Sequence, residues 1–102
     1  MRLKYGNVRT WSELCQREFA SKKECQRGEE LALLQRAGEI SNLHYQTKFV
    51  LSEKPRVSIT IDFDYFENGK RKFEDSKGVL TRDFRTKLAW LKTHHGIEVI
   101  LT

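Results

Sequence analysis

The sequence predicts an α/β domain in which a mixed β-sheet is flanked by helices. Three observations lead to this prediction. Asn68-Gly69 separates two strand-like runs and is the strongest short-range hairpin signal, because both central residues of a type I′ turn need a positive φ. A helix with clear start and stop signals precedes these strands. A second helical pattern and a short apolar run follow them, which gives the order helix, three strands, helix, strand.

The first helix is predicted to begin after Ser21 and to end at Gly38. The segment Ser21–Glu24 matches a capping box, in which the serine caps the helix and the glutamate reaches back to its amide. Gly38 suits a left-handed C-cap. An apolar stripe that includes a glycine for close packing is expected to face the core: Cys25, Gly28, Leu31, Ala32 and Leu34. The preceding segment, Trp11–Phe19, fits either a short helix or an extended lead-in.

Three strands are expected between the helices. Leu43–Leu51 alternates loosely and forms the first strand, and Ser52–Arg56, which holds the single proline, turns the chain into the hairpin. The hairpin covers Val57–Gly78, and a two-residue loop pairs Glu67 with Lys70. Counting outward from that pair fixes which residues of the two strands lie opposite each other.

The second helix is predicted to run from Thr81 or Arg82 to about His94 and to end at Gly96. Ile97–Leu101 then forms the last strand. The inner stripe of this helix is apolar and consists of Phe84, Leu88 and Leu91.

The hairpin register sets Asp62 directly opposite Asp75. Because side chains alternate along a strand, one face of the hairpin is polar, comprising Thr60, Asp62, Asp64, Asp75 and Lys77. The opposite face of the second strand is a core face, comprising Val57, Ile59, Ile61, Phe63 and Tyr65. Facing carboxylates repel, so either Lys77 or a divalent cation such as Mg²⁺ is expected between them. The alternative is a polar face that is only solvated. If the strand bulges, Asp64 replaces Asp62 as the metal ligand. Glu74 points to the other face and is expected to be a surface charge.

The composition predicts one globular domain over residues 1–102 with a basic surface. The net charge of +5 favours a polyanionic partner such as nucleic acid. No stretch approaches a membrane span, and the N-terminus lacks the apolar run of a signal peptide, so an intracellular protein is expected. Residues 1–10 are a flexible basic arm or a frayed terminus. Cys15 and Cys25 lack the spacing of a zinc site, and we expect them to act as small hydrophobic residues.

The element order and the acidic hairpin resemble the PD-(D/E)XK nuclease superfamily, which has a restriction-endonuclease-like core. Asp62 stands at the acidic position of the second strand, Asp75-Ser76-Lys77 stands at the D-x-K of the third, and Glu24 matches a first-helix glutamate. More narrowly, nearly the whole chain is similar to a small phage- and prophage-encoded protein family of this type. The segments that carry this similarity are Lys4–Asn7, Phe19–Glu24, Arg36–Ile40, Gln46–Phe49, Asp62-Phe63 and Glu74–Gly78.

The resemblance implies a Mg²⁺-dependent endodeoxyribonuclease, with Mn²⁺ as a substitute, that leaves 5′-phosphate and 3′-hydroxyl ends. Asp62 and Asp75 would hold the metal with the backbone carbonyl of Ser76. Glu24 would bind it through water, complete a second metal site, or act only as the helix cap. Lys77 would orient or deprotonate the attacking water. Ser76 departs from the usual hydrophobic middle residue of the D-x-K, and Thr47 replaces an expected proline, which puts any role of Gln46 in doubt.

The expected partner is DNA, branched like a Holliday junction or double-stranded, and a homodimer is expected if two strands are cut. The candidate DNA-contacting residues are basic, although a basic face is more often only solvated: Lys4, Arg9, Lys22, Lys23, Arg82, Arg85 and Lys87. Phe66 and Phe73 are expected to be exposed, at a dimer interface or under a loop. The resemblance places the protein in the cytoplasm of a bacterial host cell. A DNA-binding module that has lost turnover, or an interaction subunit of a phage complex, is the alternative.

Overall fold

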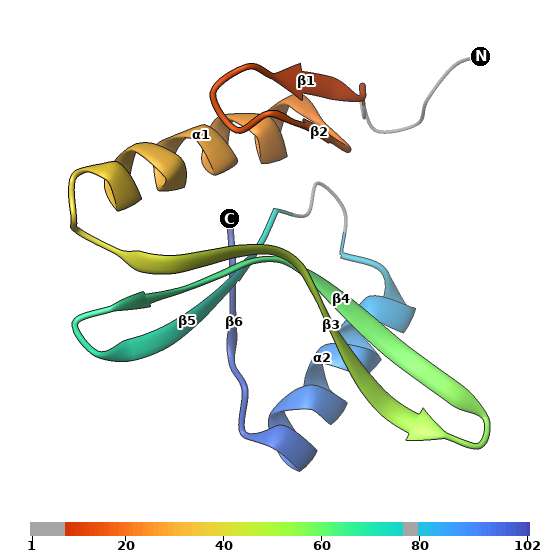
Figure 1. Cartoon of the computed structure of the whole chain (residues 1–102). Coiled ribbons are helices and arrows are strands. Elements are labelled where there is room, and N and C mark those ends of the chain that lie inside the picture. The colour runs from red at the N-terminus through yellow and green to blue at the C-terminus, as the bar shows by residue number, and fades with distance from the viewer. Residues whose placement is uncertain (1–7, 77–79) are drawn as a thin grey trace.

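A computed structural model of the chain describes residues 8–76 and 80–102 and contains a four-stranded mixed sheet, a small two-stranded sheet and two helices (Figure 1). The elements in chain order are β1 (Thr10–Ser12), β2 (Arg17–Phe19), α1 (Lys22–Arg36), β3 (Ser41–Glu53), β4 (Arg56–Glu67), β5 (Lys70–Asp75), α2 (Arg82–His95) and β6 (Val99–Leu101). The larger sheet has the order β3-β4-β5-β6, with β6 parallel to β5 and the other pairs antiparallel. The prediction of an α/β fold with a mixed sheet flanked by helices is confirmed.

The ends of both helices lie where local signals predicted them. The Ser21 hydroxyl accepts a hydrogen bond from the Glu24 amide at 3.1 Å and caps α1. At the other end Gly38 has a φ of +81°, and its amide and that of Glu39 bond back to carbonyls of the last turn, as in a Schellman motif. Thr81 caps α2, which ends at Gly96 with a φ of +66°.

The segment Trp11–Phe19, for which two structures were possible, forms an antiparallel hairpin. β1 pairs with β2 in the register Thr10–Phe19, Trp11–Glu18 and Ser12–Arg17. This hairpin lies beside α1 (Figure 1), and Phe19 of β2 packs on Tyr45 and Phe63 of the larger sheet. The predicted order of helix, three strands, helix and strand was therefore incomplete, because it omitted the hairpin that precedes α1.

The β4–β5 hairpin has the predicted register. Glu67 pairs with Lys70 and Asp64 with Phe73, and both loop residues have positive φ, 53° for Asn68 and 75° for Gly69. This register leaves Glu74 opposite Phe63, on the side of the sheet that α1 covers. The prediction that Glu74 is a surface charge was wrong, since the residue is 1% exposed.

The hydrophobic core is divided in two. The part under α1 contains Phe19, Cys25, Leu31, Ile40, Phe63 and Tyr65. The part against α2 contains Ile59, Ile61, Phe73 and Leu91. The predicted core face of β4 is buried from Ile59 to Tyr65, but its residues divide between the two cores after Ile61. Phe73 is 7% exposed, so the prediction that it lies on the surface was wrong.

The division of the core follows a bend in the long β3–β4 hairpin (Figure 1). Tyr45 pairs with Phe63 and Thr47 with Ile61, so Gln46 lies at the point where the core changes from α1 to α2. Gln46 has a φ of +55°. A left-handed conformation costs a residue with a Cβ about 1–2 kcal/mol, so the surrounding structure must hold the chain there. The bend therefore places a strained residue near the middle of β3, an edge strand of the larger sheet.

Among the helices that the structure describes, none is both long enough and apolar enough to cross a membrane.

Candidate functional site: an acidic cluster at the bend of the sheet

Four polar side chains from four different elements meet at the bend. They are Glu24 of α1, Gln46 of β3, Asp62 of β4 and Asp75 at the end of β5, and we call them the acidic cluster. The three acids are buried, with exposed fractions of 5%, 9% and 0% in chain order. Carboxylates are rarely buried to this extent unless they are paired or hydrogen-bonded, so the contacts that hold them matter.

Backbone amides of the hairpin bind the carboxylates of Asp62 and Asp75. The Asp62 amide donates to Asp75 Oδ1 at 2.9 Å, and the Ser76 amide donates to Asp62 Oδ2 at 2.8 Å. Asp75 is also fixed from its other side, because β5 pairs with β6 and the Thr102 amide donates to the Asp75 carbonyl at 3.0 Å. Both carboxylates are thus held by the backbone of a central strand pair.

Glu24 belongs to both the helix cap and the acidic cluster. Its amide is bound by the Ser21 cap, while its Oε2 accepts a hydrogen bond from Gln46 Nε2 at 3.1 Å. The same Gln46 nitrogen lies 3.3 Å from Asp62 Oδ1. One amide therefore joins the first turn of α1 to β4, and its N–H groups reduce the repulsion between the two carboxylates. The sequence left the role of Gln46 in doubt, and the structure places the side chain inside the cluster.

Asp64, the alternative to Asp62, is bound elsewhere. Its carboxylate accepts from the Thr47 hydroxyl and from Arg71 at 3.2 Å, and His44 Nδ1 lies 3.6 Å away. Asp64 is 1% exposed and pairs with Phe73 on the other core. The structure therefore brings Asp62, and not Asp64, into hydrogen-bonding contact with Asp75.

The donor chemistry of the cluster suits Mg²⁺, which prefers carboxylate and carbonyl oxygens and is often held by one or two carboxylates with water completing the shell. Asp62 and Asp75 are two such carboxylates on adjacent strands. Within residues 8–76 and 80–102, however, no group of three or more His, Cys, Asp or Glu side chains is arranged to hold a metal ion. The Gln46 amide instead lies within hydrogen-bonding distance of both Glu24 and Asp62.

The remaining predicted residues differ in their positions. Lys22 and Lys23 are exposed in the first turn of α1 beside Glu24, and Arg82 and Arg85 are exposed in the first turns of α2. Lys87 is half-buried with its Nζ 3.3 Å from Asp83, and Arg9 is bound to Glu18 at 2.6 Å. Lys4 and Lys77 lie outside the described residues.

Glu74, next to Asp75, is also a buried carboxylate, and its burial was not predicted. Arg27 of α1 donates to both oxygens of Glu74, each at 2.8 Å, and the Tyr65 hydroxyl donates to the same carboxylate. Burial alone would raise the pKa of Glu74, but the hydrogen bonds from Arg27 and Tyr65 and the charge of Arg27 lower it overall. Burial, reinforced by the Glu74 carboxylate, raises the pKa of Tyr65. This ion pair ties α1 to β5 one residue from the acidic cluster.

The fold and the site together define an α/β domain with an acidic cluster at the centre of a bent mixed sheet. Residues 2–99 match the family described as "Protein of unknown function (DUF1064)", and the chain belongs to this family. No curated protein matches the chain. Comparison with solved structures also gives no match.

Proposed function

We propose that the protein is a metal-dependent endodeoxyribonuclease with a core of the PD-(D/E)XK type. The observation that carries this proposal is the direct contact between Asp62 and Asp75 on paired strands, with Glu24 joined to them through Gln46. Cutting a phosphodiester needs neutralised phosphate charge and an activated water, and carboxylates held at one point are the residues that recruit a metal for this work.

The roles proposed for the residues are those that the resemblance implies. Asp62 and Asp75 would hold Mg²⁺ or Mn²⁺ with the backbone carbonyl of Ser76, and Glu24 would contact it through water. The bound ion would neutralise the scissile phosphate and lower the pKa of the attacking water. The backbone amides of Asp62 and Ser76 fix the two carboxylates, so that these acids need little rearrangement before reaction. Lys77, two residues beyond Asp75 in the sequence, is the proposed group that orients the water.

The proposed substrate is DNA, and branched DNA such as a four-way junction is the form that the resemblance implies. Exposed basic residues occupy the first turns of both helices and would contact phosphates rather than bases: Lys22, Lys23, Arg82 and Arg85. Cutting two strands would require two copies of the site, hence a homodimer. A function in phage or prophage DNA metabolism in the host cytoplasm completes the proposal.

A DNA-binding module without turnover is the second candidate. The specific observation in its favour is that, in the part of the chain that the structure describes, no group of three or more His, Cys, Asp or Glu side chains is placed to hold a metal ion. In this case the basic residues would supply affinity and the acidic cluster would remain metal-free.

The decisive experiment is cleavage of labelled linear, flapped and four-way DNA in Mg²⁺ or Mn²⁺. Wild-type protein is compared with Asp75→Asn and Lys77→Ala, and Asp83→Asn is the matched control because it removes an exposed carboxylate from α2. The nuclease proposal predicts cutting by the wild type and the control, and loss of cutting in the two site variants, each checked for folding. Binding without cutting on every substrate would favour the second candidate.

Metal binding is measured separately by thermal unfolding with and without Mg²⁺. A ligand at a hundredfold excess over its Kd stabilises the folded state by about 2.7 kcal/mol. The wild type and Asp83→Asn should both gain stability from Mg²⁺, and Asp75→Asn should not. Equal responses of all three proteins would contradict a metal site at the acidic cluster.

A further inference from the structure

Arg17 of β2 stacks on Tyr45, the residue that precedes Gln46 of the acidic cluster. Its guanidinium carbon lies 4.3 Å from the ring centre of Tyr45 and 5.6 Å from that of Phe19. Its Nε is buried and has no hydrogen-bond partner within residues 8–76 and 80–102, and no ion pair there includes Arg17. A buried donor without a partner is uncommon in folded proteins and calls for an explanation.

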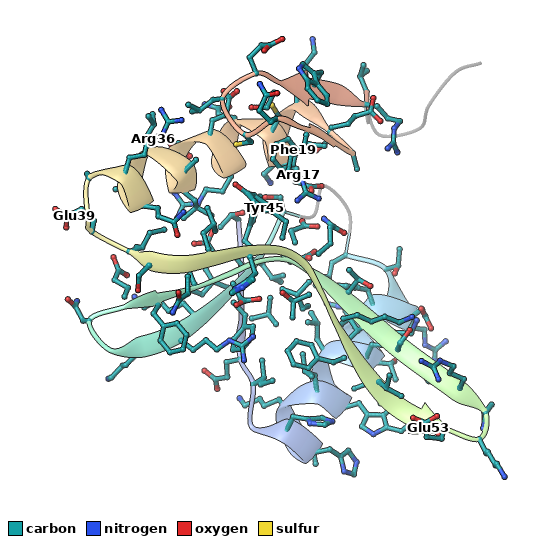
Figure 2. All side chains as sticks on the ribbon, in the orientation of Figure 1. Arg17, Phe19, Arg36, Glu39, Tyr45 and Glu53 are labelled. Carbon is teal, nitrogen blue, oxygen red and sulfur yellow. The ribbon has the colours of Figure 1, made fainter. Side chains whose placement is uncertain are left out.

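The rings that support Arg17 are linked to the acidic cluster through residues next to it in the sequence. Tyr45 immediately precedes Gln46, which binds Glu24 and Asp62. Phe19 packs on Phe63, the residue after Asp62, with 6.3 Å between the ring centres. Figure 2 shows Arg17 with Phe19 and Tyr45 between the α1 layer and the larger sheet. Arg17 thus has a fixed position on the α1 side of the cluster.

We infer that Arg17 binds a backbone phosphate of the DNA strand that enters the acidic cluster. This inference rests on the proposed function and adds a substrate-binding residue to it. A guanidinium stacked on an aromatic ring can still offer the N–H groups of its two terminal nitrogens, and those groups match two oxygens of a phosphate. Stacking also fixes the side chain before binding, so less entropy is lost when the phosphate arrives. Three buried carboxylates nearby would repel a polyanion, and a fixed cation beside them counteracts that repulsion.

A salt series of DNA binding tests this inference. Anisotropy of a labelled four-way junction is measured in Ca²⁺ for the wild type, Arg17→Gln and Arg17→Lys. Arg36→Gln is the matched control, since Arg36 is exposed at the opposite end of α1 (Figure 2). Loss of a hydrogen-bonded charged contact should weaken binding of Arg17→Gln by about tenfold or more and lower the salt slope by about 1. Arg17→Lys should keep the slope and lose part of the affinity.

The inference is overturned if Arg17→Gln binds the junction with the affinity and salt slope of the wild type. It is also overturned if Arg17→Gln and Arg36→Gln lose the same amount of affinity. A measurement on the wild type covers the case in which the variants do not fold. Phenylglyoxal modifies free guanidinium groups, and mass spectrometry reports which arginines have reacted. The DNA should protect Arg17 and leave Arg36 reactive, whereas modification of Arg17 at the same rate with and without DNA would contradict phosphate binding.

The two proposals fail in different ways. If the protein binds DNA through Arg17 but does not cleave it, the phosphate contact is supported and the nuclease proposal is refuted. Metal-dependent cleavage that is unaffected by Arg17→Gln retains the nuclease and refutes the phosphate contact. A wild-type protein that binds no DNA refutes both.

Discussion

Gly28→Ala tests how closely α1 is packed on the sheet. A Cβ at this position would lie 2.6 Å from Phe19 Cζ and 2.9 Å from its Cε1, and 3.3 Å from Phe63 Cε1. Both rings are buried, with exposed fractions of 2% and 0%. A methyl group therefore fits only if a ring moves within the core or α1 moves away from the sheet.

Two effects of opposite sign decide the outcome. Overpacking a well-filled core costs about 1–3 kcal/mol. Alanine is better than glycine inside a helix by about 0.8–1.0 kcal/mol. The packing cost exceeds the gain, so the free energy of unfolding should fall by about 1 kcal/mol, which corresponds to about 4–8 °C in Tm for a domain of this size.

Equilibrium unfolding in urea, followed by far-UV circular dichroism, measures this change. Gln26→Ala is the control, because Gln26 is exposed on α1 and its substitution reports helix propensity alone. Adding Phe19→Leu to Gly28→Ala replaces the obstructing ring with a smaller side chain. The double variant should therefore be more stable than the sum of the two single changes in the free energy of unfolding predicts. A Gly28→Ala protein that is about 1 kcal/mol more stable than the wild type would refute the close packing.

Three further predictions concern the residues around the acidic cluster. Glu74→Gln leaves Arg27 with an uncharged partner and should lower the free energy of unfolding by about 3–5 kcal/mol in urea, whereas Glu30→Gln, at an exposed pair with Arg27, should change it by less than about 1 kcal/mol. The folded-state pKa of Glu74 lies below its ordinary value of 4.5, so its contribution to the free energy of unfolding is present above that value and is lost as the pH falls through the lower folded pKa. The free energy of unfolding should therefore fall less steeply with decreasing pH in Glu74→Gln than in the wild type. Gln46→Gly should be more stable than Gln46→Ala by about 1 kcal/mol, since both lose the amide and only alanine keeps the strain at a φ of +55°; equal thermal stability would mean that the backbone is not strained there.

Local chemistry was sufficient to predict much of the fold. A serine cap with Glu24 at its third helical residue, glycines at helix ends and the Asn68-Gly69 loop each depend on residues close in sequence. The contact of Asp62 with Asp75 follows from the same loop, because the register is counted outward from it. These features need no information about the rest of the chain.

The features that were missed depend on tertiary contacts. Alternation along β5 predicts that Glu74 and Asp75 lie on opposite faces, but only the position of α1 buries Glu74 and brings Arg27 to it. Similarly, a glutamine with a positive φ carries no sequence signal, since its conformation is imposed by the two cores on either side of it. Arg17 was not recognised as a candidate binding residue, because the sequence of Trp11–Phe19 fits a helix and an extended chain equally well.

Two unfavourable features, buried carboxylates and a strained backbone, coincide at the acidic cluster. Burying carboxylates costs energy even when they are hydrogen-bonded, and the Gln46 backbone adds about 1–2 kcal/mol of strain at the same point. Contacts that offset these costs surround it: the Arg27–Glu74 pair fixes α1 to β5, and Gly28 lets Phe19 and Phe63 bring the helix close to the sheet. A polar cluster that served stability alone would be replaceable by apolar residues without strain. Backbone strain and buried charges that rigid neighbours hold in place are typical of binding and catalytic sites. The acidic cluster is therefore the part of this protein to test first.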